Sequence, residues 1–249
     1  MHVARAINQR IYPLENPMSL KKILASLLAA VLLWNGDAQA DSTPTDFQGW
    51  FQFQSYISLD DEKKYQLFLE TQPRLGDDWS RASTVQNRVG LNYNWTKAFS
   101  SMLGYAWTPN FYNSHYHSAY IDEQRIFQQV VYKHDLLGVK WAHRLRQEQR
   151  FITGAGSVSN RTRYQLRGSY SLSQDGNFGL TGYDELMVNL NDSNPGPTSG
   201  YDRDRIFLGP YWVVNGHRYE VGYLGEHLKR FGSDERWANA ILFSATFNF

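Results

Sequence analysis

The stretch Asn239–Phe249, NAILFSATFNF, decides the fold class of this chain. The residues between its apolar positions are mostly small or polar, with Leu242 as the exception. The apolar residues recur at every second position and are Ile241, Phe243, Ala245, Phe247 and Phe249. Because successive side chains of a β-strand point to opposite faces, this alternation predicts a strand with one apolar and one polar face.

Ten further segments upstream alternate in the same way, and residues 84–95 form the clearest one. There Val89, Leu91 and Tyr93 share one face, whereas Arg88 and Asn92 share the other. The ten segments cover residues 47–59, 65–73, 84–95, 98–108, 124–132, 137–151, 161–173, 178–190, 203–214 and 219–228. Strands of about 9–11 residues are long enough to cross a bilayer. A segment that ends on phenylalanine after such alternation resembles the closing strand of bacterial outer-membrane β-barrels, which the barrel-assembly machinery reads.

The N-terminal region has the features of a secretory signal peptide. Two lysines, Lys21 and Lys22, precede the apolar run Ile23–Trp34, and an A-x-A cleavage site ends at Ala40. The apolar run is shorter than the about 20 residues that a membrane-spanning helix needs. We expect residues 1–17 to be an over-extended start, residues 18–40 a signal peptide and residues 41–249 the mature barrel; an uncleaved anchor is the alternative.

Composition agrees with a barrel but does not separate it from a soluble β-sandwich. Aromatic residues make up 15% of the chain and cysteine is absent. The mean hydropathy of −0.53 beside 42% hydrophobic residues fits an apolar outside and a polar inside. A net charge of +1 argues against a nucleic-acid partner. The absence of cysteine excludes a disulfide framework.

The connections between segments alternate in length, as in outer-membrane barrels with short periplasmic turns and long external loops. Long loops at 108–123, 152–160, 191–202 and 229–236 interleave with short turns at 133–136, 173–177 and 214–218. Because a sheet in lipid must close on itself, we predict an all-β, closed antiparallel transmembrane β-barrel. Both chain ends of such a barrel should lie in the periplasm, so we expect an even strand number within 10–12, with twelve favoured.

The segment 137–151 is the most charged one, and its charges share one face. Arginine facing hydrocarbon at the midplane costs about 2–4 kcal/mol, so these side chains should line the lumen. The predicted lumen network is Arg88, Arg125, Lys140, Arg144, Arg146, Glu148, Arg150, Arg163, Arg167, Glu185, Arg205 and Glu220. Such a network either fills a narrow barrel with ion pairs or lines a narrow pore that favours anions.

Five strand motifs together resemble an uncharacterised bacterial family of predicted envelope β-barrels, known as a domain of unknown function. The motifs are LETQPRL (69–75), LGYAWTP (103–109), RIFQQVVY (125–132), HRLRQEQRF (143–151) and YDELMVNLN (183–191). The resemblance covers essentially the whole mature chain and includes an R-x-R-x-E-x-R pattern at 144–150. It implies an outer-membrane barrel and supplies no activity.

Two other functions stay open. A lipid-modifying enzyme could centre on His143, but Ser169 and Ser171 have the opposite parity and no catalytic triad is evident. A surface-binding protein could use loops 108–123 and 191–202. His115 and His117 lack a third clear ligand, so we predict no metal site and no cofactor.

The preferred prediction is a bacterial outer-membrane barrel of structural or narrow channel-like role. Its predicted partners are outer-membrane lipid and the assembly machinery that reads Phe249.

Overall fold

The computed structural model describes residues 45–111, 120–229 and 235–249, and these ranges form eleven strands. The predicted signal peptide and the loop with His115 and His117 lie outside the described residues. No helix within those ranges is long and apolar enough to cross a membrane. The strands are β1 (Thr45–Ser58), β2 (Tyr65–Gly76), β3 (Arg81–Asn94), β4 (Phe99–Asn110), β5 (Ile121–Leu136), β6 (Val139–Ile152), β7 (Ser159–Ser171), β8 (Phe178–Asn189), β9 (Gly200–Val214), β10 (His217–Lys229) and β11 (Glu235–Asn248).

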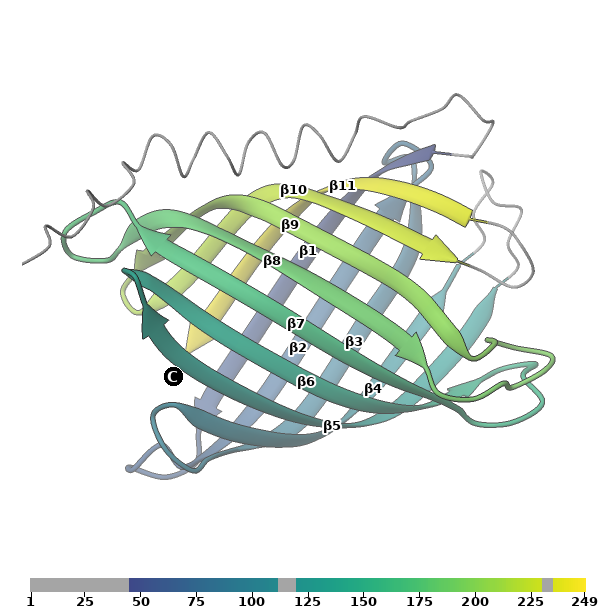
Figure 1. Ribbon diagram of the computed structural model, residues 1–249, viewed down its shortest axis with the longest axis horizontal. Helices are drawn as coiled ribbons and strands as arrows, with labels where there is room; N and C mark the ends of the chain where they lie inside the picture. Colours follow the sequence, from purple (N-terminus) through teal and green to yellow (C-terminus); the bar gives the residue numbers. More distant parts are fainter. Residues whose placement is uncertain (1–44, 112–119, 230–234) are drawn as a thin grey trace, which may run out of the picture. The chain divides into compact units, whose positions relative to one another are not determined.

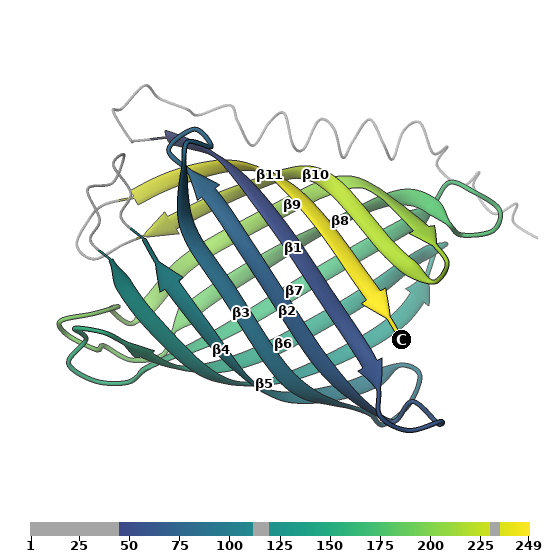
Figure 2. The ribbon, with the colours of Figure 1, turned by 180° about the vertical axis from the view of Figure 1, so that it is seen from behind.

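The strands pair in chain order and close into a barrel, which confirms the predicted fold class (Figure 1). Neighbours along the chain are antiparallel, but β1 closes the barrel against β11 in parallel, from Thr45 beside Trp237 to Tyr56 beside Asn248 (Figure 2). The favoured number of twelve was therefore wrong. The expectation of an even number placed both chain ends on one side of the barrel. Parallel pairing instead puts the start of β1 and the end of β11 at opposite rims, which an odd strand number requires.

The barrel has two rims with different connections. The C-terminal rim, as we call it, is the end where Phe249 bonds the backbone of Tyr56 and Ser58. Here β5 joins β6 through Leu137 and Gly138, and β9 joins β10 through Asn215 and Gly216. All four turn residues have positive φ, between 52° and 79°. Two-residue hairpin turns of this kind match the twist of the flanking strands. The opposite end, the loop rim, carries connections that include 153–158 and 190–199.

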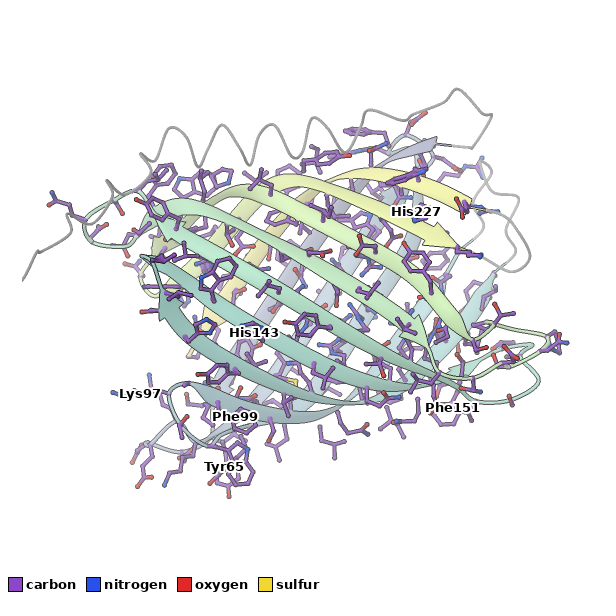
Figure 3. The ribbon with its side chains drawn as sticks, viewed as in Figure 1. Tyr65, Lys97, Phe99, His143, Phe151 and His227 are labelled. Atoms are coloured by element: carbon purple, nitrogen blue, oxygen red, sulfur yellow. The ribbon has the colours of Figure 1, made fainter. Side chains whose placement is uncertain are left out.

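Alternate residues of each strand point into and out of the barrel. On β7, for example, Arg161, Arg163 and Gln165 are buried, whereas Tyr164 between them is exposed. Aliphatic side chains such as Leu103, with 59% of its surface exposed, cover the outside. Aromatic residues lie at both rims: Tyr65 and Phe99 near the C-terminal rim, Phe151 near the loop rim (Figure 3). This arrangement matches the apolar band and aromatic girdles of membrane barrels.

Two apolar clusters lie on the inner wall. One contains Trp50, Phe207, Leu224, Ala240 and Leu242, and the other contains Phe68, Met102, Ala106 and Phe127. Leu242, the exception to the alternation of the last strand, therefore faces inward and packs in the first cluster. The rest of the interior is polar and charged, and it forms the candidate site.

Candidate functional site

Glu148 on β6 lies at the centre of the buried ion pairs. Its side chain is 1% exposed, and its Oε2 accepts hydrogen bonds from Nε and Nη2 of Arg161 at 3.0 and 2.6 Å. Its Oε1 accepts a hydrogen bond from Nη1 of Arg163 at 2.9 Å, and Nη1 of Arg146 lies 3.8 Å away. Arg161 and Arg163 come from β7, the next strand, at inward positions two residues apart. Charge-assisted hydrogen bonds of this geometry are among the strongest in proteins.

Glu185 on β8 continues the network toward the C-terminal rim. Its Oε1 accepts hydrogen bonds from Arg163, at 2.9 and 2.7 Å, and from Arg144, at 2.6 Å. Nη1 of Arg205 on β9 lies 3.8 Å from its Oε2. Arg163 thus bridges Glu148 and Glu185, so that one guanidinium joins three strands.

The opposite wall of the lumen carries its own pairs. Arg88 on β3 donates to Glu70 on β2 at 2.5 Å, and Arg205 donates to Glu226 on β10. Two arginines on this side lie against the ring of Trp50. The guanidinium carbons of Arg74 and Arg205 are 3.6 and 5.0 Å from its ring centroid. Cation–π contacts of this kind are attractive and hold the guanidinium planes in place.

Two further carboxylates pair with arginines near the loop rim. Glu123 on β5 accepts hydrogen bonds from Arg125 at 2.7 Å and from Arg150 at 2.5 Å. Asp202 on β9 accepts one from Arg161 at 2.7 Å. Because these groups are buried and paired, they fill this half of the lumen with side chains.

A larger and a smaller cavity lie in the lumen formed by the described strands. The larger, of about 500 Å³, lies toward the C-terminal rim, and we call it the vestibule. The smaller, of about 60 Å³, lies toward the loop rim. Arg163 and Arg205 line both cavities, so their ion pairs separate them. We call this layer, formed by Glu148, Arg163, Glu185 and Arg205, the ion-pair layer.

The wall of the vestibule is basic. Its acidic lining residues among those described are Glu70, Asp135, Glu185 and Glu220. Its cationic lining residues are Arg88, Lys133, Lys140, Arg144, Arg146, Arg163, Arg167, Arg205 and Arg218. Cations therefore outnumber acids by more than two to one, and a polar wall of one sign concentrates counter-ions of the other.

The structure places all twelve residues of the predicted network on the inner face. Glu148 is buried against Arg146 and Arg163, and Arg125 and Arg150 line the smaller cavity. The vestibule is lined by Arg88, Lys140, Arg144, Arg146, Arg163, Arg167, Glu185, Arg205 and Glu220. Lys140 differs from the others because it is exposed at the C-terminal rim and forms none of the ion pairs found among the described residues.

Sequence reasoning missed several members of the network. Glu123, Asp202 and Arg218 were placed in loops or turns, but β5 begins at Ile121, β9 at Gly200 and β10 at His217. Extending the period of two outward from the clear strand centres would have found Glu123, two residues before Arg125, and Arg218, two residues before Glu220. It would not have found Asp202, because the pairing register of β8 and β9 shifts beside Met187 and Asp202 is the extra residue there.

His143 faces the outside of the barrel, as its parity predicted (Figure 3). Its Nδ1 forms a hydrogen bond with the Tyr164 hydroxyl at 2.8 Å, and its ring stacks on His134. Ser169 is instead buried inside, where its hydroxyl bonds Thr181 at 2.9 Å. The barrel wall therefore separates His143 from Ser169, and the described residues assemble no serine–histidine pair at this histidine.

Hydrogen bonds hold the described connections at the loop rim to one another. The backbone amide of Gly156 donates to the carbonyl oxygens of Ser193 and Pro195, which ties the β6–β7 connection to the β8–β9 connection. The backbone amide of Ser199 donates to Asp192 at 2.6 Å and holds the pKa of that carboxyl below its ordinary value. Among the described residues, no cluster could hold a metal ion.

Comparison with known proteins gives a family, a relative and a similar barrel. The family model described as "Protein of unknown function (DUF2490)" matches residues 47–236. An uncharacterized protein of Methylorubrum extorquens is 32% identical over 204 residues, which cover 80% of this chain and 87% of that protein. A solved structure of the NanC porin overlaps with a TM-score of 0.47 at 11% identity, covering 78% of this chain and 94% of that chain.

Proposed function

The chain belongs to the family described as protein of unknown function (DUF2490), and from that premise we propose that it is a bacterial outer-membrane barrel of narrow, channel-like role whose lumen is closed at rest by buried ion pairs. The observation that carries this proposal is the ion-pair layer between the two cavities. Glu148 and Glu185 are 1% and 2% exposed, so protein atoms cover both carboxylates almost completely. Arg163 and Arg205 of this layer line both cavities, as expected of a constriction between them.

The basic wall determines which ions such a passage favours. Rings of arginine and lysine in a narrow pore attract anions and repel cations. The vestibule carries excess cationic residues, and Arg74, Arg125, Arg150 and Arg203 line the smaller cavity beyond the layer. A lumen that opens at the ion-pair layer should therefore conduct anions in preference to cations.

Removing one pair from the layer is expected to raise conductance. We expect the wild-type mature chain, refolded into planar bilayers, to give little or no current, and the variant R163A/E185A to give discrete openings several-fold larger. Both charges leave together, so the variant leaves fewer uncompensated charges in the lumen than either single change. The measurement is single-channel conductance, with the reversal potential in a KCl gradient as the test of anion preference.

The exposed pair Glu62–Lys64, in the β1–β2 turn with its atoms 2.6 Å apart, supplies the matched control E62A/K64A. This variant should behave as wild type. Equal conductance in wild type, control and R163A/E185A would contradict closure by the ion-pair layer, as would an open wild-type barrel.

The location in a membrane has a separate test. Leu103 lies near the middle of β4, faces outward beside Leu91 and is 59% exposed. In a bilayer, Leu103→Arg should lower the free energy of unfolding by about 2–4 kcal/mol, whereas on the surface of a water-soluble barrel it should cost less than about 0.5 kcal/mol. The measurement is a denaturant titration of the protein in phospholipid vesicles.

The control for this prediction is Leu137→Arg, the same change at a turn residue that is 90% exposed and lies beyond the strands. Equal small costs for both variants would argue against a membrane location.

The proposed membrane location also makes β11 the segment that the barrel-assembly machinery reads. This strand ends beside Phe249, which is exposed. Deleting Phe249 should therefore lower the amount of folded barrel in the outer membrane of cells.

A further inference from the structure

We propose that the vestibule is a binding site for small organic anions that carry two or more acidic groups. This inference deepens the proposed function and rests on it in one respect, since it names the class of solute that the lumen accepts. It is carried by unused hydrogen-bond donors, by the presence of two basic clusters on the wall of one cavity and by the size of that cavity.

The first basic cluster surrounds Glu185. Arg144 lines the vestibule with 23% of its side chain exposed, donates from Nη2 to Glu185, and finds no acceptor for Nε among the described residues. Arg163 shares the same carboxylate. Arg146 lines the cavity beside them, and its Nη1 likewise has no hydrogen-bond partner among the described residues. Each guanidinium has five N–H donors, so this cluster keeps donors and positive charge in excess of its acceptors.

The second basic cluster surrounds Glu220 on β10. Arg167 donates to it at 2.7 Å and Arg218 donates to it at 2.6 Å, so two cations share one carboxylate. Arg167 and Arg218 are each 27% exposed and both line the vestibule. Their remaining N–H groups are available to a ligand, apart from Nη2 of Arg218, which donates to Ser169.

Aromatic rings fix several of these guanidinium groups. Arg167 lies 4.9 Å from the ring centroid of Tyr183, Arg218 lies 3.9 Å from that of Tyr211, and Arg146 lies 4.5 Å from that of Phe127. A guanidinium held against a ring loses little further entropy when it binds, and its planar fork matches the two oxygens of a carboxylate or phosphate. The site is therefore pre-organised for acidic groups.

The two clusters together select for more than one acidic group. Arg144, Arg146 and Arg163 pair with Glu185 and Glu148, and Arg167 and Arg218 pair with Glu220, so the arginines outnumber the carboxylates in each cluster. A single acidic group would satisfy only one cluster. The vestibule, of about 500 Å³, has the volume typical of sites for small molecules, which span about 300–1,000 Å³. Because both clusters line this one cavity, the ligand class that would engage both is a di- or tricarboxylate, or a phosphorylated molecule of similar size.

Binding of citrate to the detergent-solubilised mature barrel, measured by titration calorimetry, tests the proposal. We expect citrate to bind, acetate and glycerol at the same concentration to bind at least tenfold more weakly, and the citrate affinity to fall with added salt. The variant R167Q/R218Q should weaken citrate binding by about tenfold or more, because hydrogen bonds to charged groups are the stronger ones. The matched control is Lys97→Gln, which removes one positive charge at the β3–β4 turn outside the lumen (Figure 3).

Equal affinity of wild type and R167Q/R218Q for citrate would overturn the proposal, and so would acetate binding as tightly as citrate. If R167Q/R218Q does not give a folded, heat-modifiable barrel, Arg144→Lys serves instead, because it keeps the charge and loses the planar fork; unchanged citrate affinity in that variant would equally overturn the site. The calorimetry involves no bilayer. A barrel that is closed in bilayers but binds no citrate would therefore contradict the site and leave the proposed closure standing.

Discussion

Replacing Glu148 by glutamine is expected to lower the free energy of unfolding of the barrel by about 3 kcal/mol, the lower end of the range for breaking a buried ion pair. The reason is that Arg161 and Arg163 would lose a charged acceptor while remaining buried at 2% and 4% exposure. The cost stays at the lower end because Arg161 still pairs with Asp202 and Arg163 with Glu185. The measurement is a denaturant titration in detergent or vesicles, followed by tryptophan fluorescence.

The control for Glu148 is the same change at Glu62, whose side chain is 70% exposed and pairs with Lys64 in the β1–β2 turn. Exposed pairs contribute about 0–1 kcal/mol, so Glu62→Gln should change stability little. The double variant E148Q/R163Q should recover part of the lost stability, because it removes one of the two arginine charges that no longer pair with Glu148. A Glu148→Gln variant as stable as wild type would mean that the ion-pair layer is not packed as described.

Gly209→Ala is expected to destabilise the barrel by about 3 kcal/mol, the upper end of the usual range for overpacking. Gly209 lies on β9 beside Pro210, between the pairs that Leu208 and Tyr211 form with β10 in one continuous register. An added Cβ would lie 2.7 Å from the Gly222 Cα and would also overlap the Val221 carbonyl oxygen. Both are backbone atoms of β10, so the strands themselves would have to separate.

Gly225→Ala on β10 is the matched control for this change. There the nearest atom to an added Cβ is the Tyr223 hydroxyl oxygen at 3.3 Å, the tip of a side chain that can move. We expect this variant to fold with stability close to that of wild type. If the two alanine variants unfold at the same temperature, the close approach of β9 and β10 at Gly209 does not limit the stability of the barrel.

Much of the fold could be predicted because a period of two reports which side of a wall each residue faces. The alternation of Arg144, Arg146 and Glu148 with Leu145 predicted an inner and an outer face, and the structure buries Arg146 and Glu148 and exposes Leu145. The resemblance to an uncharacterised family is also confirmed by the match over residues 47–236. Recurrence of the R-x-R-x-E-x-R pattern within that family stays a prediction, as does a signal peptide at residues 18–40.

Strand number and bulges were less accessible, because both depend on pairing between strands. On β8, for example, the polar Asp184 shares the parity of the apolar Leu186, and from the sequence alone this predicts a bulge near Tyr183. The structure has no bulge at that position, because Tyr183 pairs regularly with Arg167 and Phe207. Asp184 is instead exposed on the outer face of β8. The individual ion pairs could not be predicted either. Arg163 on β7 contacts Glu148 on β6 and Glu185 on β8, and only the register between these strands brings the three residues together.

The parallel pairing of β1 with β11 separates the two ends of the barrel sequence in space. Thr45 lies beside Trp237 at the loop rim, whereas Phe249 lies at the C-terminal rim. A short peptide could not fuse residue 249 to residue 45, because the connection would have to run the length of a 14-residue strand, about 45 Å. Circular permutation, which is straightforward for barrels with adjacent ends, would here need a linker of at least about 14 extended residues.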